Sequence, residues 1–382
     1  MNFELTEEQE LIRQTVRDFA EREIKPIAQE LDEKEEFSED LTRKMGELGL
    51  FGMYLPEKYG GQELDTLSYI IAVEELARVD GSQAATLAAH NSLGIGPLYY
   101  YGTEEQKLKY LPKLCTGEGL WAFGLTEPDA GSDSRGSKTT AKLEEGKWRI
   151  NGSKIFITNG ASDLSLGATV QAVTKVLPDG KKEFTTVIVE KDTPGFKRVA
   201  MHGKMMWRSS DTSELYFDDC IVPEENLLGD IGQGSKIMLS TLDNGRLSIA
   251  AMGLGLAQGA YEMALQYSKE RNQFGKPISK FQAIAFKLAD MAMQIELARN
   301  LLYKACWLKD NKKPFAKEAA MSKLYCSEIA KSVADEAVQI HGGYGLMKDY
   351  PIERFYRDQR LLQIGEGTSE IQRMVISRYI GC

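Results

Sequence analysis

Residues 282–302, QAIAFKLADMAMQIELARNLL, carry the clearest fold signal in the chain. Apolar side chains return there at steps of four and three residues, which places them along one face of a helix. A row of this kind suits a helix bundle, and a small alanine within the row lets a neighbouring helix approach closely. The row consists of Ile284, Leu288, Met291, Ile295, Ala298 and Leu302.

The helical period holds from Gly234 to the C-terminus and returns in the first third of the chain. Thr6 to Gln9 and Thr103 to Gln106 both have the spacing of a capping box, which predicts a helix start at each place. Pro26 is expected to end or bend the first helix. Residues 67–79 and 83–93 are too apolar for surface helices, so we expect them in the interior.

Between these helical parts, from about Trp121 to Gly229, short β-type runs alternate with turn signals. Residues 147–150 precede Asn151-Gly152, and residues 184–189 follow the turn signal at residues 178–180. We expect hairpins that turn at these places within a compact β-domain. The sequence therefore predicts an α+β protein with an all-α domain (1–120), a middle β-domain (121–233) and a C-terminal four-helix bundle (234–382).

The charge balance argues against a nucleic-acid binder. The 382 residues include 47 basic and 56 acidic side chains, which gives a net charge of -9, whereas a phosphate backbone needs a positive surface. No apolar run is long enough to span a bilayer, and the acidic first ten residues do not resemble a secretory or transit peptide. We expect a cytoplasmic protein without stable membrane association.

The cysteines and histidines offer few candidate ligands for a metal site. The five cysteines are scattered and odd in number, which is typical of reduced thiols. The three histidines lie far apart, and each is expected to be a hydrogen-bonded core residue, although a single catalytic histidine remains open. We expect no bound metal.

General nucleotide motifs are weak or absent. Gly253-Leu254-Gly255 and residues 342–345 lie in helical surroundings without a preceding strand, so neither qualifies as a dinucleotide fingerprint. The sequence contains no P-loop, no HExxH and no GxSxG elbow.

Five longer strings are more specific. They are FGLTEPDAGSD (123–133), NGSKIFITNG (151–160), ERNQFGKP (270–277), QIHGGYG (339–345) and IGEGTSEIQ (364–372). In this order and at these separations they closely resemble the acyl-CoA dehydrogenase family of flavoproteins. The resemblance covers essentially the whole chain and has the same helix–β–helix order.

The resemblance implies FAD as cofactor. Flavin rings need hydrogen bonds at N5 and at the N1/O2 edge and apolar cover on their faces. Thr126 matches the hydroxyl at the N1/O2 edge, Thr158 the one near N5, and Phe156 the flanking apolar residue; outside these strings both threonines would be ordinary strand residues. The implied FAD contacts are Phe123, Leu125, Thr126, Gly131, Ser132, Phe156, Ile157, Thr158, Arg271, Gln273, Phe274, Gln282, Gln339, Ile340, Gly342, Gly343, Thr368 and Glu370.

Some of these contacts imply an oligomer. Arg271 has a planar fork that suits a pyrophosphate, and in the family it acts with Gln273, Gln282 and residues 339–343 on a flavin held mainly by another subunit. The resemblance therefore implies a homo-oligomer, most simply a homotetramer, as a condition of FAD binding.

The implied reaction removes the α-proton and the β-hydride from an acyl-CoA thioester, with flavin N5 taking the hydride. The base must be desolvated and aimed, because the α-proton is a very weak acid. Glu366 matches the family's base, and the alternative base position on a helix is Gly245 here. The implied substrate contacts are Ser132, Asp243, Arg246, Gly365 and Gly367; as plain sequence, Asp243 and Arg246 would be an ordinary ion pair at a helix start.

Two positions depart from the family pattern, and both bear on the acyl group. Gly365 stands where short- and medium-chain members usually have an aromatic residue, and Met206 stands at a commonly small position. Gly365 predicts a wider pocket that accepts branched or cyclic acyl groups, unless Trp207 or Met206 fills the space. Electrons are expected to pass to an electron-transferring flavoprotein; the alternatives are an enoyl-CoA reductase coupled to the same kind of carrier and an acyl-CoA oxidase.

Overall fold

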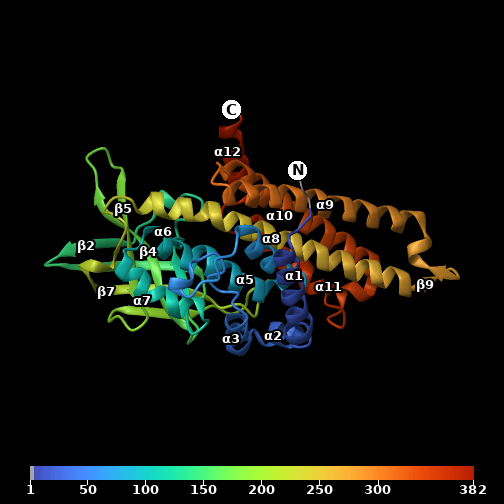
Figure 1. Ribbon diagram of the computed structural model, residues 1–382. Coiled ribbons are helices and arrows are strands. Elements are labelled where there is room, and N and C mark those ends of the chain that lie inside the picture. Colours follow the sequence, from blue (N-terminus) through green and yellow to red (C-terminus); the bar gives the residue numbers. More distant parts are fainter. Residues whose placement is uncertain (1–3) are drawn as a thin grey trace.

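The computed structural model describes residues 4–382 and shows a β-domain at one end of a long body of helices (Figure 1). Helices, strands and helices follow one another along the chain, so the expected α+β class is confirmed. The N-terminal helices are α1 (Glu7–Phe19), α2 (Ala28–Lys34), α3 (Glu39–Glu47), α4 (Thr66–Ala77), α5 (Gly81–Ala89), α6 (Gly96–Tyr101) and α7 (Glu104–Cys115).

Both expected capping boxes are present. The Thr6 hydroxyl accepts a hydrogen bond from the Gln9 amide at the start of α1, and the Thr103 hydroxyl accepts one from Gln106 at the start of α7. The first helix continues as one π-helical turn and ends before Pro26, as expected. Helices α4 and α5 are buried along nearly their whole length, which confirms that these apolar stretches lie in the interior.

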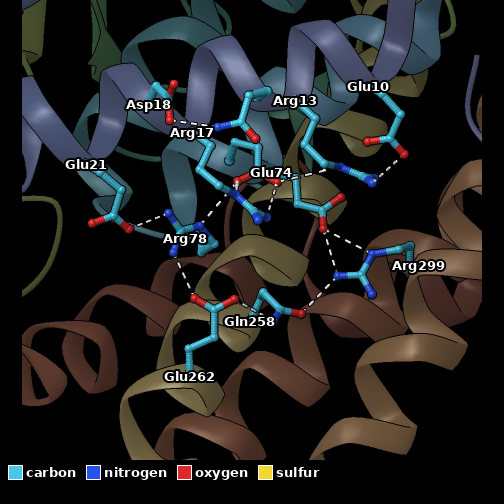
Figure 2. Close-up of polar contacts among 12 residues, drawn as sticks. Glu10, Arg13, Arg17, Asp18, Glu21, Glu74, Arg78, Gln258, Glu262 and Arg299 are labelled. Carbon is cyan, nitrogen blue, oxygen red and sulfur yellow. Dashed lines mark hydrogen bonds and ion pairs between the residues drawn. The ribbon is translucent and has the colours of Figure 1, made fainter. Parts of the chain in front are cut away.

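A network of ion pairs joins the N-terminal helices to the C-terminal bundle (Figure 2). Glu74 of α4 accepts a hydrogen bond of 2.9 Å from Arg299, and Arg78 at the end of α4 donates one of 2.8 Å to Glu262. Glu74 is buried, so removing Arg299 alone would leave an uncompensated charge inside the protein. This network fixes α4, which lies beside the candidate site described below.

The β-domain is one eight-stranded sheet with strand order β6-β7-β3-β2-β4-β5-β8, and β1 pairs with β4 in parallel. Strands β4 and β5 form an antiparallel hairpin across residues 178–180, which confirms that expected turn. The strands are β1 (Leu120–Gly124), β2 (Thr140–Glu144), β3 (Lys147–Thr158), β4 (Ser165–Val176), β5 (Lys182–Glu190), β6 (Phe196–Ala200), β7 (Thr212–Pro223) and β8 (Leu227–Leu228).

The prediction of a turn at Asn151-Gly152 is wrong. Strand β3 runs straight through these residues and pairs with β7, with a register shift between Ile150 and Gly152. Gly152 has a φ of 142°, and a Cβ there would lie 2.6 Å from the Thr139 hydroxyl. The glycine therefore marks a bulge where the backbone of β3 passes close to another segment, and the same dipeptide in another context would mark a hairpin.

The C-terminal part is a helix bundle, as expected. The row of residues 288, 291, 295, 298 and 302 on α9 is buried, and Ile284 packs against the same core. Gly253 lies where α8 crosses α10, and a Cβ on it would lie 2.8 Å from the carbonyl oxygen of Cys326, so this glycine serves helix packing. The elements are α8 (Gly234–Glu270), β9 (Asn272–Gln273), β10 (Lys276–Pro277), α9 (Gln282–Asp310), α10 (Ala316–His341), α11 (Ile352–Asp358) and α12 (Ser369–Tyr379).

Over residues 4–382, no helix has both the length and the apolar character needed to cross a membrane. In the same part of the chain, no group of three or more His, Cys, Asp and Glu side chains is arranged to hold a metal ion. The five cysteines are free thiols, and only Cys382 is exposed.

Candidate active site

Glu366 lies in a tight loop between a short 3-10 helix (Gln359–Gln363) and α12, and its backbone has a φ of 51°. The residue is partly exposed, but its carboxylate oxygen Oε2 is shielded from solvent and has no hydrogen-bond partner in the part of the chain described. Desolvation raises the pKa of this carboxyl to about 7, although Lys323 and Arg246 oppose the shift with their positive charges. A carboxylate with these properties is suited to accept a proton near neutral pH.

Helix α8 leaves room for this carboxylate at Gly245. A Cβ on Gly245 would lie 2.7 Å from Glu366 Cδ and closer still to Oε2, and 3.1 Å from a Leu93 methyl group. The next residue of the helix, Arg246, is buried and pairs with the partly buried Asp243 three residues before it. Asp243 and Arg246 lie well inside α8, so the expectation that they stand at a helix start is wrong.

Three buried polar side chains hold the loop that carries Glu366. Lys323 Nζ on α10 donates a hydrogen bond of 2.7 Å to the Gly367 carbonyl, and Gln372 Nε2 donates to the carbonyls of Gly367 (2.9 Å) and Glu366 (3.3 Å). Gln363 Nε2 donates to the Ser327 carbonyl on α10 at 2.7 Å. Sequence reasoning missed these residues, because in sequence they are ordinary polar positions on helices.

The space beside Glu366 is bordered by helices of the N-terminal part. Tyr69 of α4 is buried and donates a hydrogen bond of 3.0 Å to the Ala88 carbonyl. Burial raises the pKa of the Tyr69 hydroxyl, and the negative charge of Glu366 adds to the shift. Ser248 of α8 donates to Ser92 at 3.3 Å. The apolar character of residues 67–79 predicted that Tyr69 is buried, but its proximity to Glu366 was not visible in the sequence.

Gly365 has Leu361 as its nearest neighbour. The three heavy atoms closest to a Cβ on Gly365 all belong to Leu361, the first being Cδ2 at 3.1 Å. Trp207 lies elsewhere: its amide donates to Asp358 at 2.8 Å. Met206 packs against the helical core. Leu361 is therefore the side chain that limits the space beside Gly365.

The candidate flavin contacts of the β-domain come from two segments that lie side by side. Strand β3 holds the segment after β1, because the Ile155 amide donates to the Thr126 carbonyl at 2.9 Å and Lys154 Nζ donates to the Leu125 carbonyl at 3.2 Å. Lys154 is fully buried and also pairs with Glu127 at 2.7 Å, an ion pair that sequence reasoning missed. Phe123 and Ile157 are buried, Leu125, Thr126 and Thr158 are partly buried, and Phe156, Gly131 and Ser132 are exposed.

Phe156 presents an apolar ring to solvent. Its side chain is 64% exposed and its backbone has a φ of 60°, both unusual for an aromatic residue within a strand. This exposure beside Thr126 and Thr158 fits a residue that covers a bound apolar group.

A second set of candidate flavin contacts lines a pocket of about 530 Å³ at the other end of the molecule, near β9 (Figure 1). Arg271 lies on this pocket, with its guanidinium 5.6 Å from the centre of the Tyr344 ring. Phe274, at the tip of the β9–β10 turn, is 94% exposed. The pocket is lined by Tyr267, Arg271, Gln273, Ile278, Ile340, His341, Gly342, Gly343, Tyr344 and Met347; Gln282 and Gln339 are exposed on the adjoining helices.

Thr368 and Glu370 lie directly after the Glu366 loop. The Thr368 hydroxyl caps α12 by accepting a hydrogen bond of 3.3 Å from the Ile371 amide, and Glu370 is exposed. Both residues line a polar pocket of about 300 Å³ together with Arg360 and Gln363. The structure thus brings the last two candidate flavin contacts close to Glu366.

Comparison with known proteins identifies relatives along the whole chain. Family models described as "Acyl-CoA dehydrogenase, N-terminal domain", "middle domain" and "C-terminal domain" match residues 6–118, 122–220 and 232–381. The probable acyl-CoA dehydrogenase YngJ of Bacillus subtilis is 52% identical over 380 residues, covering 100% of both chains. A short-chain specific acyl-CoA dehydrogenase of Clostridium acetobutylicum is 49% identical over 99% of both chains. An acryloyl-CoA reductase (NADH) of Anaerotignum propionicum is 44% identical over 100% of this chain and 96% of its own length.

Solved structures agree with these matches. Butyryl-CoA dehydrogenase from Megasphaera elsdenii superposes with a TM-score of 0.96 at 46% identity, covering 100% of both chains. A chain from a study of the electron transferring flavoprotein of Acidaminococcus fermentans and flavin-based electron bifurcation has a TM-score of 0.96 at 48% identity, again over 100% of both chains. A glutaryl-CoA dehydrogenase of Mycobacterium smegmatis in complex with FADH2 has a TM-score of 0.93 at 32% identity over 99% of this chain and 95% of that one.

Proposed function

This chain is a member of the acyl-CoA dehydrogenase family, and on that premise we propose that it is an FAD-dependent enzyme that converts an acyl-CoA thioester to its trans-2-enoyl thioester with Glu366 as the base. The observation that carries the proposal is the Glu366 carboxylate, whose shielded Oε2 has no partner within residues 4–382 and whose pKa is raised to about 7. A structural carboxylate would have hydrogen-bond donors around it.

The residues present fit FAD. Arg271 offers a bidentate cation for a diphosphate in the pocket near β9, and the exposed Phe156 ring and the adjacent threonine hydroxyls offer apolar cover and hydrogen bonds for an isoalloxazine. When bound, FAD supplies the acceptor for the hydride that leaves the β-carbon of the acyl group.

Glu366 takes the other hydrogen of the reaction as a proton. Its carboxylate forms a bond to the α-proton while the α-carbon keeps the electron pair and forms the double bond to the β-carbon. Because Oε2 is shielded from solvent, the carboxylate is a stronger base than a hydrated one. Hydrogen bonds to the thioester carbonyl must stabilise the developing enolate charge.

We propose that Asp243 and Arg246 contact the CoA part of the substrate, that Ser132 is a further substrate contact, and that the acyl group lies beside Gly245 and Gly365. The relatives named for short-chain and butyryl substrates support a short acyl group. Gly365 supports some tolerance for branched or cyclic acyl groups, because no side chain projects from that position.

We also propose that electrons leave through an electron-transferring flavoprotein. The neighbour from the study of such a flavoprotein, which is 48% identical, supports this choice. The 44% identical acryloyl-CoA reductase keeps the reverse reaction as the second candidate. An acyl-CoA oxidase is the third, and its turnover would need no carrier protein.

A homotetramer in the cytoplasm completes the proposal. The pocket near β9 lies at the opposite end of the molecule from the β-domain (Figure 1). Within one subunit, the two sets of candidate flavin contacts therefore cannot surround one flavin, and a second subunit is needed to bring them together.

A steady-state assay with a panel of acyl-CoA thioesters tests the proposed function. We expect turnover of butyryl-CoA with an electron-transferring flavoprotein or an artificial acceptor, and little turnover with oxygen alone. Turnover with oxygen alone at a comparable rate would identify an oxidase. Reduction of enoyl-CoA by the reduced carrier, without measurable oxidation of acyl-CoA, would identify a reductase.

A further inference from the structure

Lys323 is a fully buried lysine on α10 that contacts the loop of the proposed base. Its Nζ donates a hydrogen bond of 2.7 Å to the Gly367 carbonyl, one residue after Glu366. Within residues 4–382 no carboxylate lies at ion-pair distance from Lys323, and the carboxylates that favour its charged form, Glu366 first among them, act on it from further away. An unpaired buried ammonium group is unfavourable, and burial lowers the pKa of Lys323 to about 8.

The backbone of the loop needs support from outside. Glu366 has a φ of 51° and Gly367 a φ of 95°, so both residues are left-handed, which is unfavourable for a residue with a side chain. Lys323 and Gln372 together supply donors to the carbonyls of residues 366 and 367. These bonds fix the two peptide units that directly follow Glu366, and so restrict the position from which its side chain extends.

The electrostatic surroundings of Glu366 point to the same lysine. The charged groups that act on Glu366 are Lys323 and Arg246, and Lys323 has the larger effect. Arg246 is already paired with Asp243, whereas Lys323 is not paired. Glu328 and Glu370 act on Lys323 from α10 and α12 and favour its charged form.

We propose that Lys323 is a positioning residue for the base: it fixes the loop through the Gly367 carbonyl, and its buried charge favours the ionised form of Glu366. This inference rests on the proposed function. Lys323 contributes a hydrogen bond and a charge, and the chain offers a residue with the first property alone, Gln372, which is neutral and contacts the same carbonyl.

Three variants separate the two contributions. Lys323→Met loses both, Lys323→Gln loses the charge and keeps a donor, and Gln372→Met loses a donor and keeps the charge. We expect the acidic limb of the kcat/KM profile to move to higher pH by about one unit in both Lys323 variants, because the opposing charge is gone. In Gln372→Met the acidic limb of the kcat/KM profile should stay at the same pH. The value of kcat at high pH should fall about tenfold, because the Glu366 carboxylate is no longer held in its position.

The protonation of Glu366 is also measured directly, by infrared difference titration of each holoenzyme against the same protein carrying Glu366→Gln. The carboxyl signal should titrate at higher pH in Lys323→Gln than in the parent. An unmoved titration in Lys323→Gln, or an equal shift in Gln372→Met, would overturn the role of Lys323. If the flavin of the Glu366→Gln protein is still reduced by acyl-CoA, the proposal that Glu366 is the base is wrong. This result differs from an unmoved titration in Lys323→Gln, so failure of the proposed function and failure of the role of Lys323 are distinguished.

Discussion

Gly245 and Glu366 occupy one space: the carboxylate of Glu366 fills the volume that any side chain at position 245 would take. Helix α8 is buried here and cannot move away, because it packs against α4 and α10 along its length. The missing side chain at position 245 therefore leaves the space that the carboxylate of the proposed base, Glu366, occupies.

Gly245→Ala should displace the carboxylate rather than unfold the protein. The overlapping atoms are at the end of a flexible side chain, and alanine favours a helix by about 1 kcal/mol over glycine. We expect flavin reduction by acyl-CoA to slow by about 100-fold through misplacement of the base, with FAD content unchanged. The rate is measured by stopped-flow absorbance of the flavin.

Gly96→Ala is the matched control. A Cβ on this buried helical glycine would have its nearest neighbours at 3.8 Å, an ordinary contact distance. Its reduction rate should equal that of the parent. Equal rates in both variants would show that Gly245 does not need to be small.

The raised pKa of Glu366 predicts how its replacement changes stability with pH. Burial raises the pKa of the folded carboxyl to about 7 from its ordinary value of 4.5, so between these pH values the folded state binds more protons than the unfolded state. Stability therefore falls as pH rises through this window, by up to about 3 kcal/mol from this group. Glu366→Gln removes the titrating carboxyl and with it this pH-dependent loss of stability.

The Gln variant should thus melt at a higher temperature than the parent at pH 8 and at nearly the same temperature at pH 4.5. Calorimetry of samples with equal FAD content measures the difference. A Tm difference that is the same at both pH values would contradict the raised pKa.

Gly365→Tyr should narrow the acyl pocket. The new ring must pass Leu361, whose Cδ2 lies 3.1 Å from the position of the added Cβ. A side chain that occupies the substrate's space discriminates strongly, so we expect kcat/KM for 2-methylbutyryl-CoA and cyclohexanecarboxyl-CoA to fall at least tenfold relative to butyryl-CoA. If the parent already prefers the straight-chain thioester and the substitution leaves the ratios of kcat/KM unchanged, the proposal of a wide acyl pocket is wrong.

Arg271→Ala should weaken FAD binding without touching the β-domain. We expect at least a tenfold rise in the dissociation constant of FAD, because a charge-assisted bidentate contact is lost. Arg22→Ala, on an exposed surface, is the control. Sedimentation of the parent should show a tetramer that retains FAD; a stable monomer that retains FAD would contradict the role of Arg271 across subunits.

Local rules and long motifs made much of the fold predictable. The capping boxes at Thr6 and Thr103 and the buried row on α9 depend on residues a few positions apart, so the sequence contains them completely. The Asn151-Gly152 turn was wrong because the reason for the glycine is its contact with Thr139 in another segment. A tertiary contact of this kind leaves no local pattern.

The same distinction applies to the site. Glu366 was recognisable as a candidate base because it sits in a long motif whose order along the chain is characteristic. Lys323, Tyr69 and the Lys154–Glu127 pair were not, since each is defined by what it meets across the fold. For Lys323 and the Lys154–Glu127 pair, the burial of a charged residue stands out in the structure, but a helical or strand pattern that treats lysine as a surface residue does not reveal it.

Removal of the α-proton by Glu366 is tested by anaerobic stopped-flow mixing of the Glu366→Gln holoenzyme with butyryl-CoA. Glutamine keeps the shape of the side chain and loses the proton acceptor. We expect a flavin spectrum that shifts as the thioester binds and then shows no bleaching over a time in which the parent is fully reduced. Bleaching of the flavin within about tenfold of the parent rate would contradict it, because a base outside Glu366 would then be responsible.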